Sequence, residues 1–150
     1  MNANDTNQNK EIHDDQAIVA DCIFCKIIRN EIPAVKVYED TETLAFLDIS
    51  PNTRGHVLVI PKTHFENIYG LPAETWCLMN LTAQKIAVAL KTSLSADGIN
   101  IAMNNESRAG QIIFHAHIHV IPQYNDFDEK KYTYVAGEME EVAKNIQEVI

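Results

Sequence analysis

Three histidines in the last third of the chain, His115, His117 and His119, alternate with apolar residues. Because alternate side chains of a β-strand point to the same face, this spacing predicts three imidazoles along one side of a strand, with the apolar residues facing the core. Pro122 would end that strand, since proline has no N–H to donate. Packing alone explains the row poorly, because each imidazole carries two polar nitrogens that need partners when buried.

The histidine row is compatible with four interpretations. It could be a solvated polar face, or a metal site, since histidines two residues apart suit tetrahedral zinc. It could serve phosphoryl or nucleotidyl transfer, in which one neutral imidazole is the nucleophile and its neighbours stabilise charge. In a fourth, combined interpretation, one histidine holds a structural metal and the others carry out the chemistry. The spacing does not separate the last three.

Cys22 and Cys25 form a C-x-x-C motif in a segment whose apolar spacing predicts a short helix over 22–29. A redox motif of this kind follows a strand in a thioredoxin-like unit, and no strand is expected before this one. Two buried structural thiols or half of a zinc site remain as interpretations. Because the chain has no second C-x-x-C, histidines would have to supply the other two zinc ligands.

The composition is typical of a single soluble globular domain, with 150 residues, 46% hydrophobic and 22% charged. The net charge of −9 argues against a general nucleic-acid binder, but a small anionic ligand senses only the local field of its pocket. The chain has no apolar run long enough to predict a membrane span, and its polar N-terminus lacks the apolar core of a signal peptide. Three cysteines are too few for a secreted disulfide scaffold, so we expect a cytoplasmic protein.

Hydrophobic periodicity predicts the elements that must position these residues. Residues 1–20 are polar and are expected to form a mobile extension. Strands are expected at 35–39, 43–48, 56–62, 99–103 and the histidine row, and helices at 22–29, about 73–95 and about 135–150. The long helix carries a broad apolar stripe, which indicates core packing or a subunit interface. Gly98 is expected to end that helix in the left-handed conformation.

The residues around the histidines form a longer pattern. Residues 110–122, with Gly-Gln, three spaced histidines and Val-Ile-Pro, resemble the signature of the histidine-triad (HIT) family of nucleotidyl hydrolases and transferases. Together with residues 22–28, 45–51 and 55–64, they look like the purine-nucleoside phosphoramidase branch, and the resemblance extends over 22–124. It implies a HIT-like fold: an α+β domain over 21–150, with an antiparallel sheet of about five strands, one long helix and a C-terminal helix.

The resemblance also implies catalytic roles. His117, the middle histidine, would be the nucleophile that attacks the α-phosphorus of a nucleotide, and water would then resolve the covalent nucleotidyl-histidine. His119 and His56 would bracket the phosphate or the leaving group. Gln111 and Asn104 would donate hydrogen bonds that stabilise developing charge. The sequence departs from many relatives directly after this glutamine, where it has isoleucine in place of serine or threonine.

The first half of the chain would hold the rest of a purine nucleotide. By the same resemblance, Asp48 would accept hydrogen bonds from the ribose hydroxyls. The residues that would line the base pocket are all apolar; they are Ile23, Phe24, Ile27, Phe46 and Ile49.

Some members of the family that have a C-x-x-C carry a structural zinc. The matching residues here are Cys22, Cys25, His64 and His115. Two thiolates and two imidazoles suit tetrahedral zinc with no open position for catalysis. The resemblance thus favours the combined interpretation, in which the first histidine of the row holds metal and the other two carry out the chemistry. It also implies a homodimer and no organic cofactor.

The leading functional hypothesis is hydrolysis of a nucleoside phosphoramidate, an acyl nucleotide or a dinucleoside polyphosphate, with release of a nucleoside monophosphate. One alternative is a zinc-stabilised nucleotide sensor with little activity. A third hypothesis is a metallohydrolase that uses all three histidines of the row as ligands. Neither nucleic acid nor a membrane is expected as a partner.

Overall fold

The computed structural model describes residues 19–126 and 131–150. The helices are α1 (Ile23–Ile28), α2 (Ala73–Ser93) and α3 (Glu138–Gln147), with short 3-10 helices η2 (Ile68–Gly70) and η3 (Ser107–Ala109). The strands are β1 (Lys36–Glu39), β2 (Thr43–Leu47), β3 (Val57–Pro61), β4 (Gly98–Ala102) and β5 (Ile118–Gln123). The predicted extension over 1–20 lies outside the described residues except at its last two positions.

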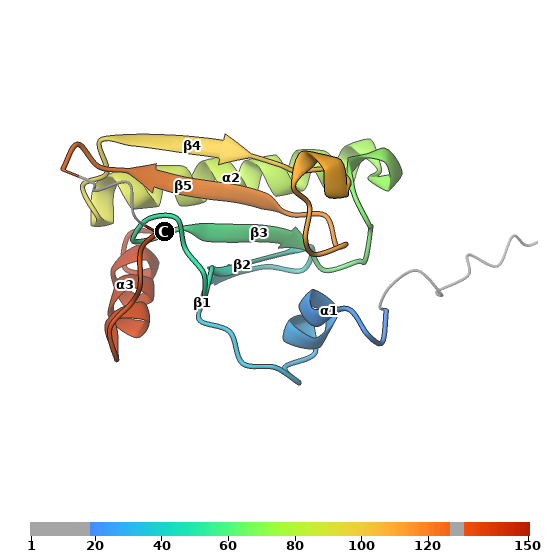
Figure 1. The fold of residues 1–150 in the computed structure, drawn as a ribbon, viewed down its shortest axis with the longest axis horizontal. Helices are drawn as coiled ribbons and strands as arrows, with labels where there is room; N and C mark the ends of the chain where they lie inside the picture. The colour runs from blue at the N-terminus through green and yellow to red at the C-terminus, as the bar shows by residue number, and fades with distance from the viewer. Residues whose placement is uncertain (1–18, 127–130) are drawn as a thin grey trace, which may run out of the picture.

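The five strands form one antiparallel sheet in the order β1-β2-β3-β5-β4. Figure 1 shows α2 running along one face of this sheet, while α3 lies near the β1 side and α1 lies apart from both. The α+β class and the five-stranded antiparallel sheet are therefore confirmed. Because β5 inserts between β3 and β4, the last histidine of the row lies in the interior of the sheet, away from both edges.

Alternating side chains give the sheet two apolar faces. The face toward α2 and α3 carries Ala45, Leu47, Val57, Val59, Ile118 and Val120. The face toward α1 carries Leu44, Phe46, Leu58 and Ile60, packed against Phe24 and Ile27. His119 is paired with Leu58 in the register of β3 and β5, so its side chain lies on the α1 face. The apolar residues that alternate with the histidines, Ala116, Ile118 and Val120, are buried as predicted, and Ile118 and Val120 belong to the core cluster that faces α2.

The strand predicted for the histidine row is shorter than expected. It begins after His117, so only His119 lies in β5, while His115 and His117 precede it. The backbone of the earlier residues is engaged elsewhere: the Ala116 N–H donates to the carbonyl of Phe65 at 2.6 Å instead of to a neighbouring strand. The three rings are therefore held by a loop and a strand together.

Pro122 does not end this strand, which continues to Gln123 with Pro122 opposite Ile99 of β4. The prediction failed because the backbone groups of this proline point toward the β3 side, where no residue of β3 is paired with it. Its carbonyl accepts a hydrogen bond from Thr53 Oγ1 at 2.5 Å, on the side where β3 has not yet begun. The missing N–H points the same way, so no ladder hydrogen bond is lost.

The end of α2 also differs from the prediction. The helix ends at Ser93, and the residue with left-handed backbone is Ser95, with φ of 53°, not Gly98. Gly98 instead opens β4. Lys91 Nζ donates to the carbonyl of Ala96 at 2.5 Å, so a side chain near the end of the helix satisfies a backbone acceptor of the turn.

The long helix is apolar on two sides. Its inner side packs into the core through Met79, Ala83, Ile86, Ala89 and Leu90. Its outer side exposes Leu81 and Val88, whose exposed fractions are 59% and 62%. Within residues 19–126 and 131–150, every helix falls short of the length and hydrophobicity that crossing a bilayer requires.

Candidate functional site

Two cysteines and two histidines from three separate segments meet beside α1. Cys22 is the N-cap of α1, Cys25 lies one turn later, His64 follows β3 and His115 precedes β5. The Sγ atoms of Cys22 and Cys25 lie 3.4 and 3.6 Å from His115 Nδ1, and Cys25 Sγ lies 3.4 Å from His64 Nδ1. The two Nδ1 atoms are 3.1 Å apart. The four residues predicted as metal ligands are thus brought together, and we call this group the Cys/His cluster.

These distances fit one tetrahedral ion. With zinc bonds of about 2.3 Å to sulfur and about 2.0 Å to nitrogen, tetrahedral angles place a sulfur and a nitrogen ligand about 3.5 Å apart and two nitrogens about 3.3 Å apart. The observed distances, from 3.1 to 3.6 Å, agree with this within a few tenths of an ångström. The donor set of two thiols and two imidazoles therefore forms a candidate site for a four-coordinate metal.

A hydrogen bond beside this cluster leaves one lone pair of His115 turned inward. His115 Nε2–H donates to the carbonyl of Pro61 at 2.8 Å, which leaves His115 Nδ1 unprotonated at the cluster. Burial lowers the pKa of His115 to about 4, so the ring is neutral at pH 7. Burial raises the pKa of the Cys25 thiol, so its thiolate form needs a cation beside it.

The second histidine of the row is fixed by a hydrogen bond outside the cluster. His117 is buried, and its Nδ1–H donates to the carbonyl of His115 at 2.7 Å. That bond fixes the tautomer and leaves Nε2 with a free lone pair. Burial also lowers the pKa of His117, which favours the neutral ring. The edge of the Phe24 ring packs against it, with ring centroids 5.3 Å apart. His117 is therefore a neutral ring in a fixed tautomer, with an unprotonated Nε2.

The third histidine ends a chain of hydrogen bonds that starts at the backbone. The N–H of Asn52 donates to His56 Nδ1 at 3.1 Å, so the neutral His56 ring carries its proton on Nε2. His56 Nε2 lies 2.9 Å from His119 Nδ1 and donates to it. The proton of the His119 ring must then reside on Nε2. Burial lowers the pKa of His119 to about 4, so this ring is also a neutral donor at pH 7.

Asp48 completes a group of three potential metal ligands with His56 and His119, whose ligand atoms all lie within 4.8 Å of one another. The hydrogen bonding argues against a metal there. A metal-binding imidazole donates its other N–H to an acceptor, whereas His56 accepts from the N–H of Asn52. The arrangement is therefore a hydrogen-bonded chain between two rings, in contrast to the Cys/His cluster.

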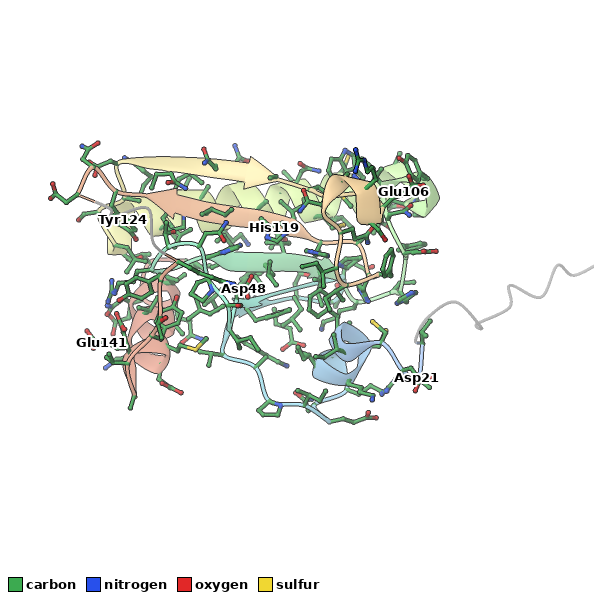
Figure 2. The ribbon with its side chains drawn as sticks, viewed as in Figure 1. Asp21, Asp48, Glu106, His119, Tyr124 and Glu141 are labelled. Carbon is green, nitrogen blue, oxygen red and sulfur yellow. The ribbon has the colours of Figure 1, made fainter. Side chains whose placement is uncertain are left out.

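Asp48 lies directly after β2, beside these two rings. Figure 2 labels Asp48 at the end of β2 and His119 on β5, and the ligand atoms of these two residues lie within 4.8 Å of each other. Asp48 Oδ1 accepts from the N–H of Ser50 at 2.8 Å, while Oδ2 lies 3.8 Å from His56 Nε2. One carboxylate oxygen thus remains for a further partner, which is compatible with its predicted contact to a ribose hydroxyl.

Gln111 is placed near the row but is already fully bonded. Its Nε2 donates to the carbonyls of Glu66 and Ile113 at 2.6 and 3.1 Å, and its Oε1 accepts from the N–H of Glu106. No amide hydrogen is left for a phosphate, so in this structure Gln111 fixes the loop instead of acting as a free donor. Asn104 Nδ2 lies in the same loop, 3.7 Å from where a Cβ on Gly110 would stand.

The five residues predicted for the base pocket divide into two groups. Phe24, Ile27 and Phe46 are buried in the cluster on the α1 face. Ile23 and Ile49 are 39% and 83% exposed. A buried floor with two exposed apolar side chains is compatible with a planar base, and the contact with a base stays a prediction.

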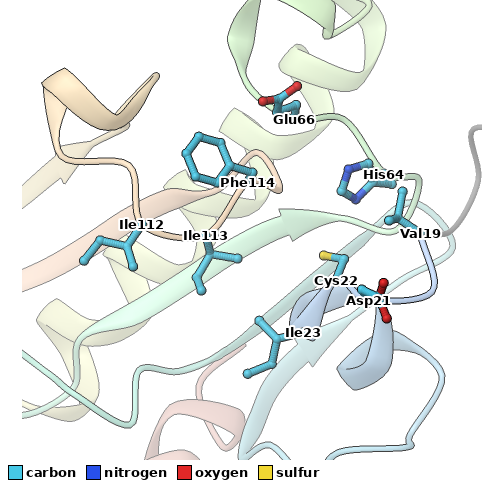
Figure 3. A pocket seen from close by; sticks show the side chains of 9 residues that line it. All are labelled: Val19, Asp21, Cys22, Ile23, His64, Glu66, Ile112, Ile113 and Phe114. Atoms are coloured by element: carbon cyan, nitrogen blue, oxygen red, sulfur yellow. The ribbon is translucent and has the colours of Figure 1, made fainter.

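An open groove of about 550 Å³ passes the Cys/His cluster. Figure 3 shows Cys22 and His64 in its wall, with Ile23, Ile112 and Phe114 farther along. Cys25 and His115 are buried behind them. Two of the four candidate ligands are therefore reachable from outside the folded protein.

The sequence did not reveal the groups that fix the tautomers. These groups are the N–H of Asn52 and the carbonyls of Pro61 and His115, and all three are backbone atoms. A backbone group has no residue-type signature, so only the folded path of the chain could identify it.

The fold and the row of three histidines define the class of histidine-triad domains, and the HIT domain model matches residues 29–126. The chain is 50% identical over 107 residues to the protein hit of Bacillus subtilis, which covers 71% of this chain and 74% of that protein. It is 43% identical over 103 residues to an adenylylsulfatase of Arabidopsis thaliana, covering 69% of this chain and 52% of that protein. The chain therefore belongs to the HIT family.

Solved structures agree with this assignment. A Hit-like protein of Bartonella henselae, described as involved in cell-cycle regulation, has a TM-score of 0.81 and 40% identity and covers 89% of this chain and 100% of its own. A zinc-bound histidine triad family protein of Mycobacterium smegmatis has a TM-score of 0.79 and 40% identity, covering 86% of this chain and 92% of its own.

Proposed function

We propose that this protein is a nucleotide hydrolase that transfers a nucleotidyl group from the α-phosphate of its substrate first to His117 and then to water. One observation carries the proposal: His117 is buried and neutral, and its Nδ1–H is committed to a backbone carbonyl, which leaves Nε2 free to attack. The substrate would be a purine nucleoside phosphoramidate, acyl nucleotide or dinucleoside polyphosphate. The Arabidopsis thaliana relative named as an adenylylsulfatase supports an adenylyl substrate.

In the first step, the Nε2 lone pair of His117 forms a bond to the α-phosphorus and the bond from phosphorus to the leaving group breaks. His119 Nε2–H, the N–H that the chain of hydrogen bonds leaves on this ring, donates a hydrogen bond to the leaving group, which takes up its proton from water. His56 steadies the His119 ring through its Nε2–H. The product of this step is a nucleotidyl-histidine and the free leaving group.

In the second step, water attacks the same phosphorus, is held by its surroundings only through hydrogen bonds, and releases one proton to the solvent. The bond to His117 Nε2 breaks, so a nucleoside monophosphate leaves and the His117 ring returns to its starting tautomer. Asp48 would hold the ribose, and the apolar side chains on the α1 face would hold the base during both steps.

The Cys/His cluster would hold zinc as a structural ion. The donor set, the distances and the inward lone pair of His115 support this assignment, as does the zinc-bound Mycobacterium smegmatis relative. When bound, zinc would stabilise both thiolates and join α1 to the loop after β3 and to His115. We expect a cytoplasmic protein, whose reducing surroundings would keep Cys22 and Cys25 available as ligands.

The distinct tautomers of the three rings speak against a metallohydrolase that uses the whole row. Only His115 presents an unprotonated nitrogen to the cluster. His117 Nδ1 bonds to a carbonyl, and His119 Nδ1 accepts from a ring N–H. The three rings therefore do not converge on one ion.

Trapping of the covalent intermediate tests the proposed function. Zinc-loaded protein mixed with excess adenosine phosphoramidate and quenched without acid should gain the mass of one adenylyl group. His117→Ala should gain none, because the attacking nitrogen is gone. Intact-protein mass spectrometry measures the adduct, and AMP release is followed in the same samples.

Two results would count against this proposal. Folded, zinc-loaded wild type with neither adduct nor AMP would favour the nucleotide sensor. AMP release that persists in His117→Ala would show that another group performs the attack. Cys77→Ser, a change at an exposed cysteine outside the cluster, serves as the control for handling of thiols.

We also propose that the protein is a homodimer formed through β4 and the outer side of α2. β4 is an edge strand of the sheet, with unpaired backbone groups along one side. Ile101 on β4 is 53% exposed and lines a hollow together with Leu81 and Val88 of α2. A second copy related by a two-fold axis could pair with the edge and cover the apolar side chains.

The dimer predicts a mass in solution of twice 16.9 kDa. Val88→Glu combined with Ile101→Glu should give the monomer mass, because two buried charges per subunit would oppose association. Size-exclusion chromatography with light scattering measures both. The matched control is Val149→Glu, an exposed apolar residue after α3. A monomeric wild type at micromolar concentration would refute the proposal.

A further inference from the structure

We propose that the metal centre aims the nucleophile: a metal held by the Cys/His cluster fixes the peptide group between His115 and Ala116, and that peptide group orients His117. His115 is then a positioning residue that acts through its backbone. This inference rests on the proposed function for His117, but it assigns the metal a second task besides stabilising the fold.

The side chain of His115 has two anchors. Its Nε2–H donates to the carbonyl of Pro61, the last residue of β3. Its Nδ1 faces His64 and the two cysteine sulfurs at 3.1 to 3.6 Å. The ring is buried, so it has little room to turn except by moving its own backbone. The position of the ring therefore determines the position of the peptide group that follows it.

That peptide group is bonded at both ends. Its carbonyl, from His115, accepts from His117 Nδ1–H at 2.7 Å. Its N–H, from Ala116, donates to the carbonyl of Phe65 at 2.6 Å. Phe65 directly follows His64, which is itself a candidate ligand. A metal would therefore join both segments that hold this peptide group, one through His115 and the other through His64.

The next residue of the same loop extends the connection. The carbonyl of Glu66 accepts from Gln111 Nε2, and Gln111 holds the loop that leads into the histidine row. Residues 64–66 thus contact the row at two points. When they shift, the direction of the His117 ring should change. The base pocket senses the metal less directly, through Cys22, which packs against the apolar cluster on the α1 face.

A metal would change how the four groups of the cluster are joined. Without metal, the cysteine thiols can donate weak hydrogen bonds to the Nδ1 atoms of His64 and His115 at 3.4 to 3.6 Å. A metal would replace these weak hydrogen bonds with four metal–ligand bonds, so the position of His115 should be fixed more firmly in the loaded protein. Because Cys22 and His64 line the open groove in Figure 3, we expect a chelator to reach the metal from that side of the folded domain.

The decisive measurement is the tautomer of His117 with and without metal. Protein labelled with ¹⁵N in its histidine rings is compared as the zinc-loaded form and after removal of zinc by a chelator, at a temperature where circular dichroism shows that both are folded. The His117→Asn spectrum assigns the signals. We expect one Nδ1–H tautomer in the loaded form and a mixture of both tautomers in the metal-free form.

A second measurement separates an effect of the metal on the orientation of His117 from a general loosening of the fold. The rate of adenylyl transfer to His117 should fall at least about tenfold on metal removal, the scale of effect seen when groups that orient an active residue are lost. The Kd for AMP should rise by a smaller factor than the rate falls, because Phe46 on β2 should keep its place in the base pocket when α1 loosens. Added zinc should restore both the tautomer and the rate. A metal that only stabilised the fold would change the AMP Kd and the transfer rate together.

A pair of variants isolates His115. His115→Cys offers a sulfur ligand in place of the imidazole and keeps the backbone carbonyl, so the zinc-loaded variant should retain the single His117 tautomer. His115→Ala leaves three ligands and should resemble the metal-free protein even in excess zinc. If the metal-free protein unfolds, cadmium-loaded protein is used instead. Its larger ion should displace the His117 Nδ1–H resonance from its position in the zinc form.

An unchanged His117 tautomer in metal-free protein, or an unchanged resonance in the cadmium form, would overturn the inference. The failure of the proposed function looks different: the loaded protein would form no adduct, yet the tautomer of His117 would still respond to metal. The two hypotheses can therefore fail independently.

Discussion

His117→Gly is expected to lower kcat for adenosine phosphoramidate by at least about 10⁴-fold, because it removes the attacking atom of a two-step covalent reaction. The fold should survive, because neither apolar core cluster includes His117, although its ring contacts with Phe24 and His119 are lost. Steady-state release of AMP measures the loss. Added imidazole should raise the rate of the His117→Gly variant about tenfold, because it can occupy the space that the ring leaves.

Substrates with different leaving groups separate the proposed role of His117 from that of His119. A p-nitrophenyl ester of AMP departs without a proton, so His119→Ala should turn over this ester almost as fast as wild type. On the phosphoramidate, whose leaving group needs a proton, His119→Ala should lose about 10² to 10⁴-fold. His117→Gly should lose activity on both substrates. Equal losses for both variants on the ester would mean that the two roles have been assigned wrongly.

Zinc is expected to raise the Tm of metal-free protein by about 8 to 16 °C. At a free zinc concentration a thousand times the Kd, binding to the folded state alone adds about 4 kcal/mol. For a chain of this length, each kcal/mol shifts Tm by about 2 to 4 °C. Thermal unfolding followed by circular dichroism, with zinc buffered at a series of free concentrations, measures the shift and its dependence on zinc.

The response to zinc should depend on the Cys/His cluster alone. Cys25→Ala removes one ligand and should abolish most of the shift, whereas Cys77→Ser should keep all of it, because Cys77 lies exposed on α2. Asp48→Asn tests the other candidate group of ligands and should also leave the shift intact. If Asp48→Asn reduced the shift instead, zinc would be binding at the His56 and His119 rings.

Much of the site was predictable from residue types and their spacing. The four candidate ligands are separated by up to 93 residues, yet the resemblance placed all of them in one cluster, and the structure brings them together. The five strands and the long helix followed from hydrophobic periodicity. These features depend on which side chains are present, and a sequence records that directly.

The features that could not be predicted depend on backbone hydrogen bonds. The strand of the histidine row starts late because the Ala116 N–H bonds to Phe65, and nothing in either side chain indicates this pairing. Pro122 continues the strand because β3 has no residue paired there. Gln111 has the right residue type for a phosphate donor, but its amide hydrogens are used by two carbonyls. Long-range contacts decided each of these cases.

Backbone atoms also determine where the ring protons lie. Pro61 and His115 each contribute a backbone carbonyl, and Asn52 contributes a backbone N–H. Any residue type supplies such a carbonyl, and every type except proline supplies such an N–H. The protonation pattern of the site is therefore tolerant of substitution around it. In related proteins, the side chains that recognise the substrate can therefore change while the backbone conformation keeps the same tautomers and the same reaction.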